Sequence, residues 1–340
     1  MLAENPKGES RALRLRPHVF RRVSRPARTW AGWLDRAAAV ALAVVLLGVA
    51  ACTGTAREPF PSPTSRASEA GPRSPSAATA VDKVLVIMEE NRSVQDAEEH
   101  MPFFMSQAES YGAATNFYAI EHPSLPNYLA LAGGSTFGVS DDEDPDAHRL
   151  QGSSVFRQLI SAGRTAKTYA EAMPTNCARR NHETYAVRHN PWTYFDDDAE
   201  RANCDNFDVP SGTPTAGALV DDITAGKLPT VGLLIPDTCH DGHDCPATTT
   251  DDWLRSWLPT IKNGPDFTSN RLAIVVTWDE DDDHSGNRVP MVVIHGSLNG
   301  KRVTTQLDHY GLSASLARVG GIPPLRNASK RADALAAFGI

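Results

Sequence analysis

Positive charge is scarce in most of this sequence. The chain has 33 Lys or Arg and 41 Asp or Glu, and residues 1–36 contain nine of the basic residues but only three of the acidic ones. The remaining 304 residues therefore hold 24 basic and 38 acidic side chains, a net charge of −14. An acidic body of this size repels phosphate backbones, which excludes nucleic-acid binding as the main function.

Cysteine and long apolar runs are also in short supply. None of the five cysteines forms a C-x-x-C pair, so the spacing of a zinc ribbon is missing. The uncharged apolar run Ala37–Ala51 has 15 residues, fewer than the roughly 20 needed to span a membrane. The overall composition is that of a globular protein. Its 41% hydrophobic and 7% aromatic residues exclude wholesale disorder.

The first 51 residues have the pattern of an export signal. A basic segment precedes the apolar run, and Val49-Ala50-Ala51-Cys52 resembles the bacterial lipobox, in which the signal is cut before a cysteine that is then lipid-modified. We therefore expect a lipoprotein-type signal peptide over 1–51 and a lipid anchor at Cys52. The protein would be exported and held on the outer face of a bacterial cell membrane, or secreted. An uncleaved anchor and an ordinary signal cleaved nearby are the alternatives.

The four cysteines after Cys52 are an even number, as two disulfides in an oxidising compartment require. Their closeness in sequence favours the pairs Cys177–Cys204 and Cys239–Cys245. Three connectivities are possible, and the sequence alone does not exclude the other two.

The rest of the chain divides into a tether and one domain. Residues 52–80 are rich in Pro, Ser and Ala without an apolar period, which predicts a disordered tether. Residues 81–340 alternate short apolar runs with helical segments, which predicts an α/β fold: a single three-layer domain with a mostly parallel central sheet. We expect strands at 83–88, 231–235, 272–277 and 290–295, and helices near 98–110, 125–132, 153–162, 213–226, 250–263 and 311–319.

Polar residues follow two of the expected strands, at the sheet edge where ligands bind in such folds. Glu89-Glu90-Asn91-Arg92-Ser93 comes directly after the strand at 83–88, and Asp279-Glu280-Asp281-Asp282-Asp283 follows the strand at 272–277. Carboxylate and amide oxygens are ligands for hard cations, and neighbouring carboxylates repel one another unless a cation or solvent relieves them. A solvated acidic loop is the alternative for each segment.

Two further segments could contribute to chemistry. Ser124 precedes a Pro and an apolar run ended by Gly-Gly, which predicts a helix with Ser124 at its N-cap. The residue is then either a simple cap or a nucleophile favoured by the helix N-terminus and a nearby metal. The segment 236–245 holds three Asp and two His and contains two cysteines of an expected disulfide, which favours a metal or phosphate site. His309 precedes the last expected helix.

In this order, the segments resemble the phosphoesterase family, which includes bacterial acid phosphatases and phospholipases C within the alkaline phosphatase superfamily. The resemblance covers about residues 83 to 327. It rests on VLVIMEENRS, HPSLPNYLALAGG, RHNPWTYF, IPDTCHDGHD, VVTWDEDDD and HYGLSASLARVGGIPPLRNAS.

The resemblance implies an alkaline-phosphatase-like fold and a role for individual residues. Ser124 matches the nucleophile, and His189 of RHNP matches a substrate-pocket position. The positions that match metal-binding residues are Glu90, Asn91, Asp279, Glu280, Asp241, His243 and His309, with Glu280 in place of a more usual Asp.

These positions imply a metal-dependent phosphoric ester hydrolase that forms a phosphoserine at Ser124. One or two divalent ions are expected, Mg²⁺, Mn²⁺ or Ca²⁺ at the oxygen ligands, with Zn²⁺ or iron admitted by the histidines. The short C-terminal part favours an acid-phosphatase-like phosphomonoesterase over a phospholipase C. A non-catalytic surface lipoprotein that binds metal or phosphate is a third hypothesis, disfavoured because every proposed site position holds a competent residue.

Overall fold

An eight-stranded sheet organises residues 81–340, which are the residues that the computed structural model describes. The strand order is β5-β4-β6-β1-β7-β8-β2-β9, and every strand is parallel to the rest except β8, which is antiparallel to both neighbours. The expected mostly parallel sheet is confirmed. The strands are β1 (Lys83–Glu89), β2 (Gly112–Ala114), β4 (Ala166–Ala170), β5 (Asp208–Pro210), β6 (Val231–Ile235), β7 (Leu272–Trp278), β8 (Met291–Ile294) and β9 (Lys301–Val303).

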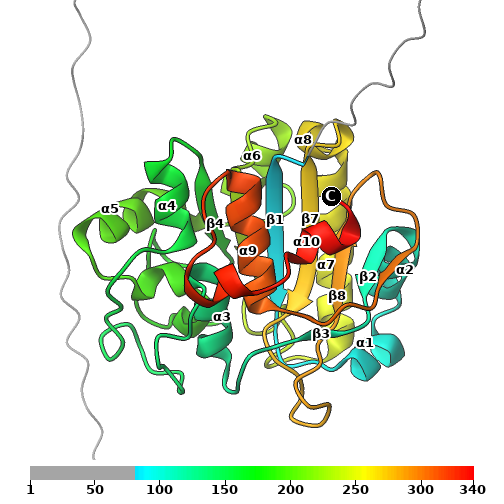
Figure 1. Cartoon of the computed structure of the whole chain (residues 1–340), viewed down its shortest axis with the longest axis horizontal. Coiled ribbons are helices and arrows are strands. Elements are labelled where there is room, and N and C mark those ends of the chain that lie inside the picture. The colour runs from blue at the N-terminus through cyan, green and yellow to red at the C-terminus, as the bar shows by residue number, and fades with distance from the viewer. Residues whose placement is uncertain (1–80) are drawn as a thin grey trace, which may run out of the picture. The chain divides into compact units, whose positions relative to one another are not determined.

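The centre of the sheet is apolar because helices cover both of its faces. All residues of β1, β6 and β7 are buried. Figure 1 looks onto the face covered by α9, with α7 behind the sheet, so the domain has three layers. The helices on the near side are α3 (Ser124–Gly133), α4 (Val155–Ser161), α9 (His309–Gly320) and α10 (Ala334–Phe338), and α7 (Ala247–Asn263) packs with α1 (Val94–His100), α2 (Pro102–Ser110), α6 (Ala218–Thr224) and α8 (Pro265–Thr268).

The remaining elements are small or lie at the edge of the sheet. They are β3 (Phe117–Tyr118) and β10 (Leu307–Asp308), which pair with each other, α5 (Asp198–Phe207), and the 3₁₀ turns η1 (Val187–His189), η2 (Pro191–Tyr194) and η3 (Arg326–Lys330). Within residues 81–340 there is no helix with the length and hydropathy of a membrane span. The expected signal peptide, lipidated Cys52 and tether precede residue 81, outside the described residues, and stay predictions.

Two of the expected helices differ from those observed. The helix expected over 98–110 is divided into α1 and α2 at Met101, because the ring of Pro102 disfavours helical backbone in the residue before it. The helix expected from 213 begins only at Ala218, after Gly217 with φ of +119°. The short strands β2, β4, β5 and β9 were not among the expected elements, since three to five residues give little periodic signal.

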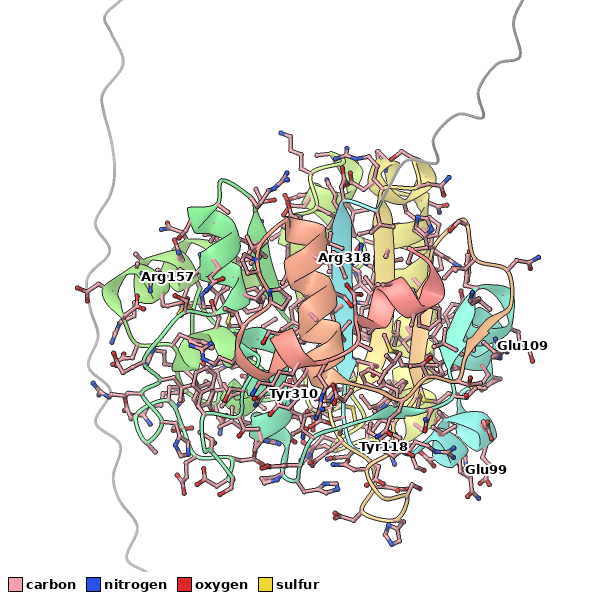
Figure 2. All side chains as sticks on the ribbon, in the orientation of Figure 1. Glu99, Glu109, Tyr118, Arg157, Tyr310 and Arg318 are labelled. Atoms are coloured by element: carbon pink, nitrogen blue, oxygen red, sulfur yellow. A yellow bond between two sulfur atoms is a disulfide. The ribbon has the colours of Figure 1, made fainter. Side chains whose placement is uncertain are left out.

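The polar segments of the sequence come together because β6, β1 and β7 are neighbours in the sheet. The arrowheads of β1 and β7 point to the same end of the molecule, at the bottom of Figure 1. In Figure 2, Tyr310 at the start of α9 also lies toward this end, whereas Arg318 lies further up the helix. The loops after these three strands therefore share one edge of the sheet.

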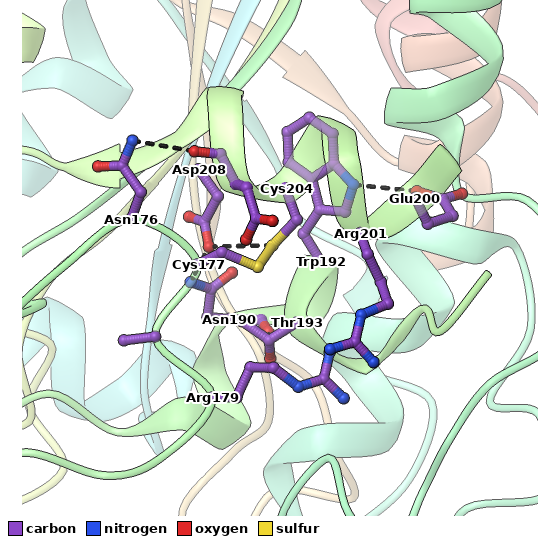
Figure 3. Close-up of a disulfide and its surroundings, with 12 residues drawn as sticks. Asn176, Cys177, Arg179, Asn190, Trp192, Thr193, Glu200, Arg201, Cys204 and Asp208 are labelled. Carbon is purple, nitrogen blue, oxygen red and sulfur yellow. Dashed lines mark hydrogen bonds between the residues drawn. A yellow bond between two sulfur atoms is a disulfide. The ribbon is translucent and has the colours of Figure 1, made fainter. Parts of the chain in front are cut away.

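Both expected disulfides are confirmed. Cys177 and Cys204 are joined with a Cα–Cα distance of 5.3 Å, beside Asp208 and Asn190 (Figure 3). Cys239 and Cys245 are joined with a Cα–Cα distance of 4.7 Å and close the loop that follows β6. The second disulfide thus constrains a loop at the carboxyl edge of the sheet.

The buried carboxyl of Asp208 makes the stability of the folded protein depend on pH. This carboxyl accepts hydrogen bonds from Thr168 and, at 2.8 Å, from Asn190 Nδ2. Burial raises the pKa of Asp208 to about 7, although the two hydrogen bonds lower it. Since the unfolded residue titrates near pH 4, the native state loses stability as pH rises from about 4 to about 7.

We expect Asp208→Asn to remove about 4 kcal/mol of this pH dependence. The measurement is the free energy of unfolding in urea at pH 4 to 8. The matched control is Asp205→Asn, an exposed position in the same segment, which should behave as the wild type. An unchanged pH profile in Asp208→Asn would contradict the prediction.

Candidate functional site

Ser124 is the first residue of α3 and is 2% exposed. The expectation that it caps the helix is wrong, because Pro123, whose side chain makes no capping hydrogen bond, occupies the N-cap. The Ser124 hydroxyl instead donates a hydrogen bond of 2.9 Å to Glu90 Oε2. A buried hydroxyl whose hydrogen bond goes to a carboxylate rather than to the helix is free of a capping role and suited to chemistry.

Glu90 follows β1 directly and has three polar neighbours. Besides Ser124, its carboxylate accepts a hydrogen bond of 2.7 Å from the Tyr128 hydroxyl and lies 3.2 Å from His189 Nε2. Burial and the charges of Asp279 and Asp241 raise the pKa of Glu90, while the hydrogen bonds from Tyr128 and Ser124 lower it. The group is therefore poised to take a proton or a cation.

Asp279 follows β7 and lies beside the Glu90 segment, as the pairing of Glu89 with Trp278 requires. Its Oδ1 accepts a hydrogen bond of 3.3 Å from the amide of Asn91, whose φ of +55° turns the chain at this point. Its Oδ2 is buried and has no hydrogen-bond donor among the described residues. Burial raises the pKa of Asp279 to about 7, against the lowering effect of nearby Ser124.

Glu280 is buried next to Asp279. Burial and the charge of Asp279 raise its pKa to about 9. His122, two residues before Ser124, pairs with this acidic segment, because its Nδ1 lies 2.8 Å from Glu280 Oε2. Asp281, by contrast, accepts hydrogen bonds from three amides of its own loop, which gives it a structural role.

Asp241 brings the loop after β6 to the same place. Its Oδ1 accepts a hydrogen bond of 2.8 Å from the His243 amide, and its Oδ2 lies 3.1 Å from His189 Nδ1. Burial raises the pKa of Asp241 to about 8 and lowers that of His189 well below its usual value. His189 therefore bridges Glu90 and Asp241, and ligand atoms of these three residues are close enough together to share one metal ion.

The other two expected histidines differ in exposure, since His309 is buried and His243 is partly exposed. His309 begins α9, is fully buried, and its Nε2 donates a hydrogen bond of 2.7 Å to the Asp279 backbone carbonyl. Burial lowers the pKa of His309 to about 4, so it is neutral at physiological pH. The His243 side chain is 33% exposed and contacts Asp244 at 2.8 Å. In the described residues His309 is thus a neighbour of Asp279, and His243 a neighbour of Asp241.

The donor set fits a divalent cation. Glu90, Asp279, Glu280 and Asp241 are buried carboxyl groups with raised pKa values, and they have few basic neighbours. Such groups are stable together only when protonated or when a cation neutralises them. The unpartnered Asp279 Oδ2 is an oxygen available for coordination, and carboxylate oxygens suit Mg²⁺, Mn²⁺ or Ca²⁺.

Sequence reasoning missed three residues of the site, namely His122, Asn127 and Tyr128. The last two lie three and four residues after Ser124, the spacing that places side chains on one side of a helix. Tyr128 binds Glu90 and stacks on the His189 ring, with 5.3 Å between ring centres. Helical spacing from Ser124 is the signal that could have identified Asn127 and Tyr128.

Asn127 holds the chain that leads to Ser124. Its Oδ1 accepts hydrogen bonds from the amides of Ile120 and Glu121, and its Nδ2 donates to the carbonyls of Glu121 and Pro123. Because Asn127 is fully buried, Asn127→Ala would leave these amides without an acceptor. We expect a loss of about 3 kcal/mol in the free energy of unfolding.

Urea denaturation of Asn127→Ala tests this expectation. The control is Asn206→Ala, an exposed residue with one side-chain bond to the Ala202 carbonyl, which should change stability by less than about 0.5 kcal/mol. Equal stability of the two variants would show that Asn127 does not hold the loop.

Comparisons with known proteins identify the family. The model of the phosphoesterase family matches residues 97–323. A phosphatidylinositol-3-phosphatase of Mycobacterium tuberculosis is 31% identical over 249 residues, which cover 71% of this chain and 77% of that protein. An acid phosphatase of Aspergillus fumigatus is 31% identical over 310 residues, 84% of this chain and 66% of the relative.

Other matches extend less far or show the fold alone. The chain spans about half of a phosphate-repressible acid phosphatase of Penicillium chrysogenum, at 29% identity and 52% of its length. A crystal structure of a protein in the alkaline phosphatase superfamily from Vibrio parahaemolyticus superposes with a TM-score of 0.51 at 12% identity, over 75% of this chain and 72% of that one. The expected superfamily fold is confirmed.

Proposed function

This chain belongs to the phosphoesterase family and hydrolyses phosphoric esters, and we propose that it does so as a metal-dependent phosphomonoesterase with Ser124 as its nucleophile. The observation that carries the proposal is the buried Ser124 hydroxyl, which donates to Glu90 at the edge where three neighbouring strands end. Buried carboxyl groups at the same edge supply a donor set for a cation.

The reaction follows from the contacts of Ser124. Its oxygen attacks phosphorus as the hydroxyl proton, directed toward Glu90, passes to solvent. The bond between phosphorus and the ester oxygen breaks, and the ester oxygen takes a proton and leaves as an alcohol. Water then attacks the phosphorus of the phosphoserine, the bond to the Ser124 oxygen breaks, that oxygen takes one of the water's protons, and phosphate is released.

Other residues of the site orient these groups. Tyr128 and His189 hold the Glu90 carboxylate, and His309 holds the backbone carbonyl of Asp279. We assign His243, a histidine that solvent reaches, to the leaving group or a phosphoryl oxygen. A divalent cation bound by Glu90, Asn91, Asp279 and Glu280 would acidify the Ser124 hydroxyl and neutralise charge on the phosphoryl oxygens.

The substrate is proposed to be a phosphomonoester. The names of the relatives support this class, and the phosphatidylinositol-3-phosphatase supports including a lipid phosphomonoester among the candidates. A phospholipase C that removes a whole head group is the alternative, and a lipid anchor at Cys52 would bring either enzyme to a membrane.

The test is a substrate and metal panel with the full-length protein. After removal of metal, the protein is assayed with p-nitrophenyl phosphate, bis(p-nitrophenyl) phosphate, p-nitrophenylphosphorylcholine and phosphatidylinositol 3-phosphate, each with Mg²⁺, Mn²⁺, Ca²⁺ or Zn²⁺. Metal-dependent cleavage of the monoesters supports the proposal. Preference for the choline ester would favour a phospholipase C, and folded, metal-loaded protein without turnover would favour a binding protein.

A further inference from the structure

The proposed site needs positive charge from the protein as well as from a metal. Its buried carboxyl groups are Glu89, Glu90, Asp241, Asp279 and Glu280. A phosphomonoester arrives with about two negative charges. Without a cationic side chain near Ser124, the surroundings of the metal would repel the oxygens that the metal does not bind.

Arg188 is a cationic side chain in the right place. It lies in η1 directly before His189, and its side chain is 18% exposed. Its one ion pair is long, with 3.7 Å between Nε and Asp142 Oδ2, and within residues 81–340 its guanidinium has no hydrogen-bond partner. The two terminal nitrogens of the guanidinium fork are therefore available to a ligand.

Arg188 lies near the nucleophile in sequence and through one contact. The next residue, His189, lies 3.2 Å from Glu90, the hydrogen-bond acceptor of Ser124. The Arg188 guanidinium itself pairs with Asp142, whose Oδ1 accepts a hydrogen bond of 2.9 Å from the amide of Leu125, the residue after Ser124. This contact places the guanidinium on the side of the site where α3 begins.

Arg92, another arginine of this edge, is not available in the same way. Its Nη2 donates hydrogen bonds of 2.8 Å to the carbonyls of Gly242 and Cys245, and its Nε lies 3.5 Å from Asp96. These contacts hold the loop closed by the second disulfide. Within residues 81–340, Arg188 makes no such hydrogen bonds to backbone carbonyls, and its long ion pair with Asp142 leaves its terminal nitrogens unused.

We propose that Arg188 binds two non-ester oxygens of the substrate phosphoryl group and thereby makes the site selective for phosphomonoesters over phosphodiesters. The inference rests on the proposed function and deepens it. A guanidinium fork matches two oxygens of a phosphate and forms two parallel charge-assisted hydrogen bonds.

The selectivity follows from counting oxygens. A monoester has three non-ester oxygens, so one can face the carboxylate-rich metal site while two engage the Arg188 fork. A diester has only two, so a fork aimed at two oxygens meets a neutral ester oxygen in place of one of them. A diester thus gains one charge-assisted hydrogen bond from Arg188 where a monoester gains two.

The experiment compares Arg188→Ala, Arg188→Lys and the wild type in full-length, metal-supplied protein. For Arg188→Ala we expect kcat/KM on p-nitrophenyl phosphate to fall about 100-fold and that on bis(p-nitrophenyl) phosphate by less than about fivefold. Lysine, a point charge, should restore no more than about a tenth of the lost monoester activity. The matched control is Arg180→Ala, an exposed arginine paired with Asp144 and Asp146, which should leave both values unchanged.

Equal losses on the two esters, or no loss on the monoester, would overturn the inference. Binding of inorganic phosphate, measured by calorimetry with Mn²⁺ present, needs no turnover and separates this inference from the proposed function. If the wild type hydrolyses no ester, the proposed function fails. Weaker phosphate binding by Arg188→Ala than by Arg180→Ala would still support the Arg188 subsite, and equal binding would refute it.

Discussion

Ser124→Ala is expected to reduce kcat on p-nitrophenyl phosphate by about 10⁴-fold, with the fold retained. The reason is that the hydroxyl is the only group that the proposed mechanism places in covalent contact with phosphorus. Its removal deletes one hydrogen bond to Glu90 and leaves Tyr128 and His189 beside the same carboxylate. Substrate binding should therefore change much less than kcat.

The matched control for this change is Ser313→Ala. Ser313 is also a buried helical serine, but its hydroxyl has no hydrogen-bond partner among the described residues, so its loss should leave kcat unchanged. Mass spectrometry of wild-type protein quenched during turnover should detect phosphate on the peptide that contains Ser124. Activity of Ser124→Ala within tenfold of the wild type would rule out the serine nucleophile.

Removal of metal is expected to have the second large effect, with at least a 10³-fold loss of activity that a divalent cation reverses. Asp279→Asn should show the same loss without reversal, because it removes a charged ligand. Although Asp279→Asn lowers activity, it should raise the stability of the metal-free protein. Since burial raises the pKa of Asp279 to about 7, the ionised residue destabilises chelated protein above that pH, and asparagine removes this penalty.

Thermal unfolding at pH 8 measures both effects in one series. Chelated Asp279→Asn should melt at a higher temperature than the chelated wild type, and Mn²⁺ should raise the melting temperature of the wild type alone. Asp281→Asn is the contrasting variant, because Asp281 accepts amides of its own loop, and it should lower stability with and without metal. An equal response of Asp279→Asn and the wild type to Mn²⁺ would exclude Asp279 as a ligand.

The local sequence was sufficient to predict where the carboxyl groups gather. Glu90 and Asp279 each follow an apolar run, and parallel strands place the residues after them at one edge, so their closeness follows from the strand pattern alone. The direction of β8 was not predictable in this way, because an apolar run of four residues has the same appearance in either orientation.

The contacts of the histidines required the folded chain. His189 lies in a 3₁₀ turn without periodicity, 99 residues after Glu90, and only the tertiary fold places it between Glu90 and Asp241. The resemblance to a family indicated that His309 belongs to the site but not that it binds the backbone of Asp279. For Ser124 the local sequence was misleading, because it predicted a helix cap, whereas the hydroxyl is hydrogen-bonded to Glu90.

The ring that the Cys239–Cys245 disulfide closes has a consequence for how the site uses binding energy. Asp241 and His243 lie within it, and Arg92 also holds the carbonyls of Gly242 and Cys245. A free loop of this length would lose backbone entropy of roughly 1 kcal/mol per residue on becoming ordered around a ligand. Here that ordering is completed when the protein folds, so contact with phosphate remains available for stabilising the transition state.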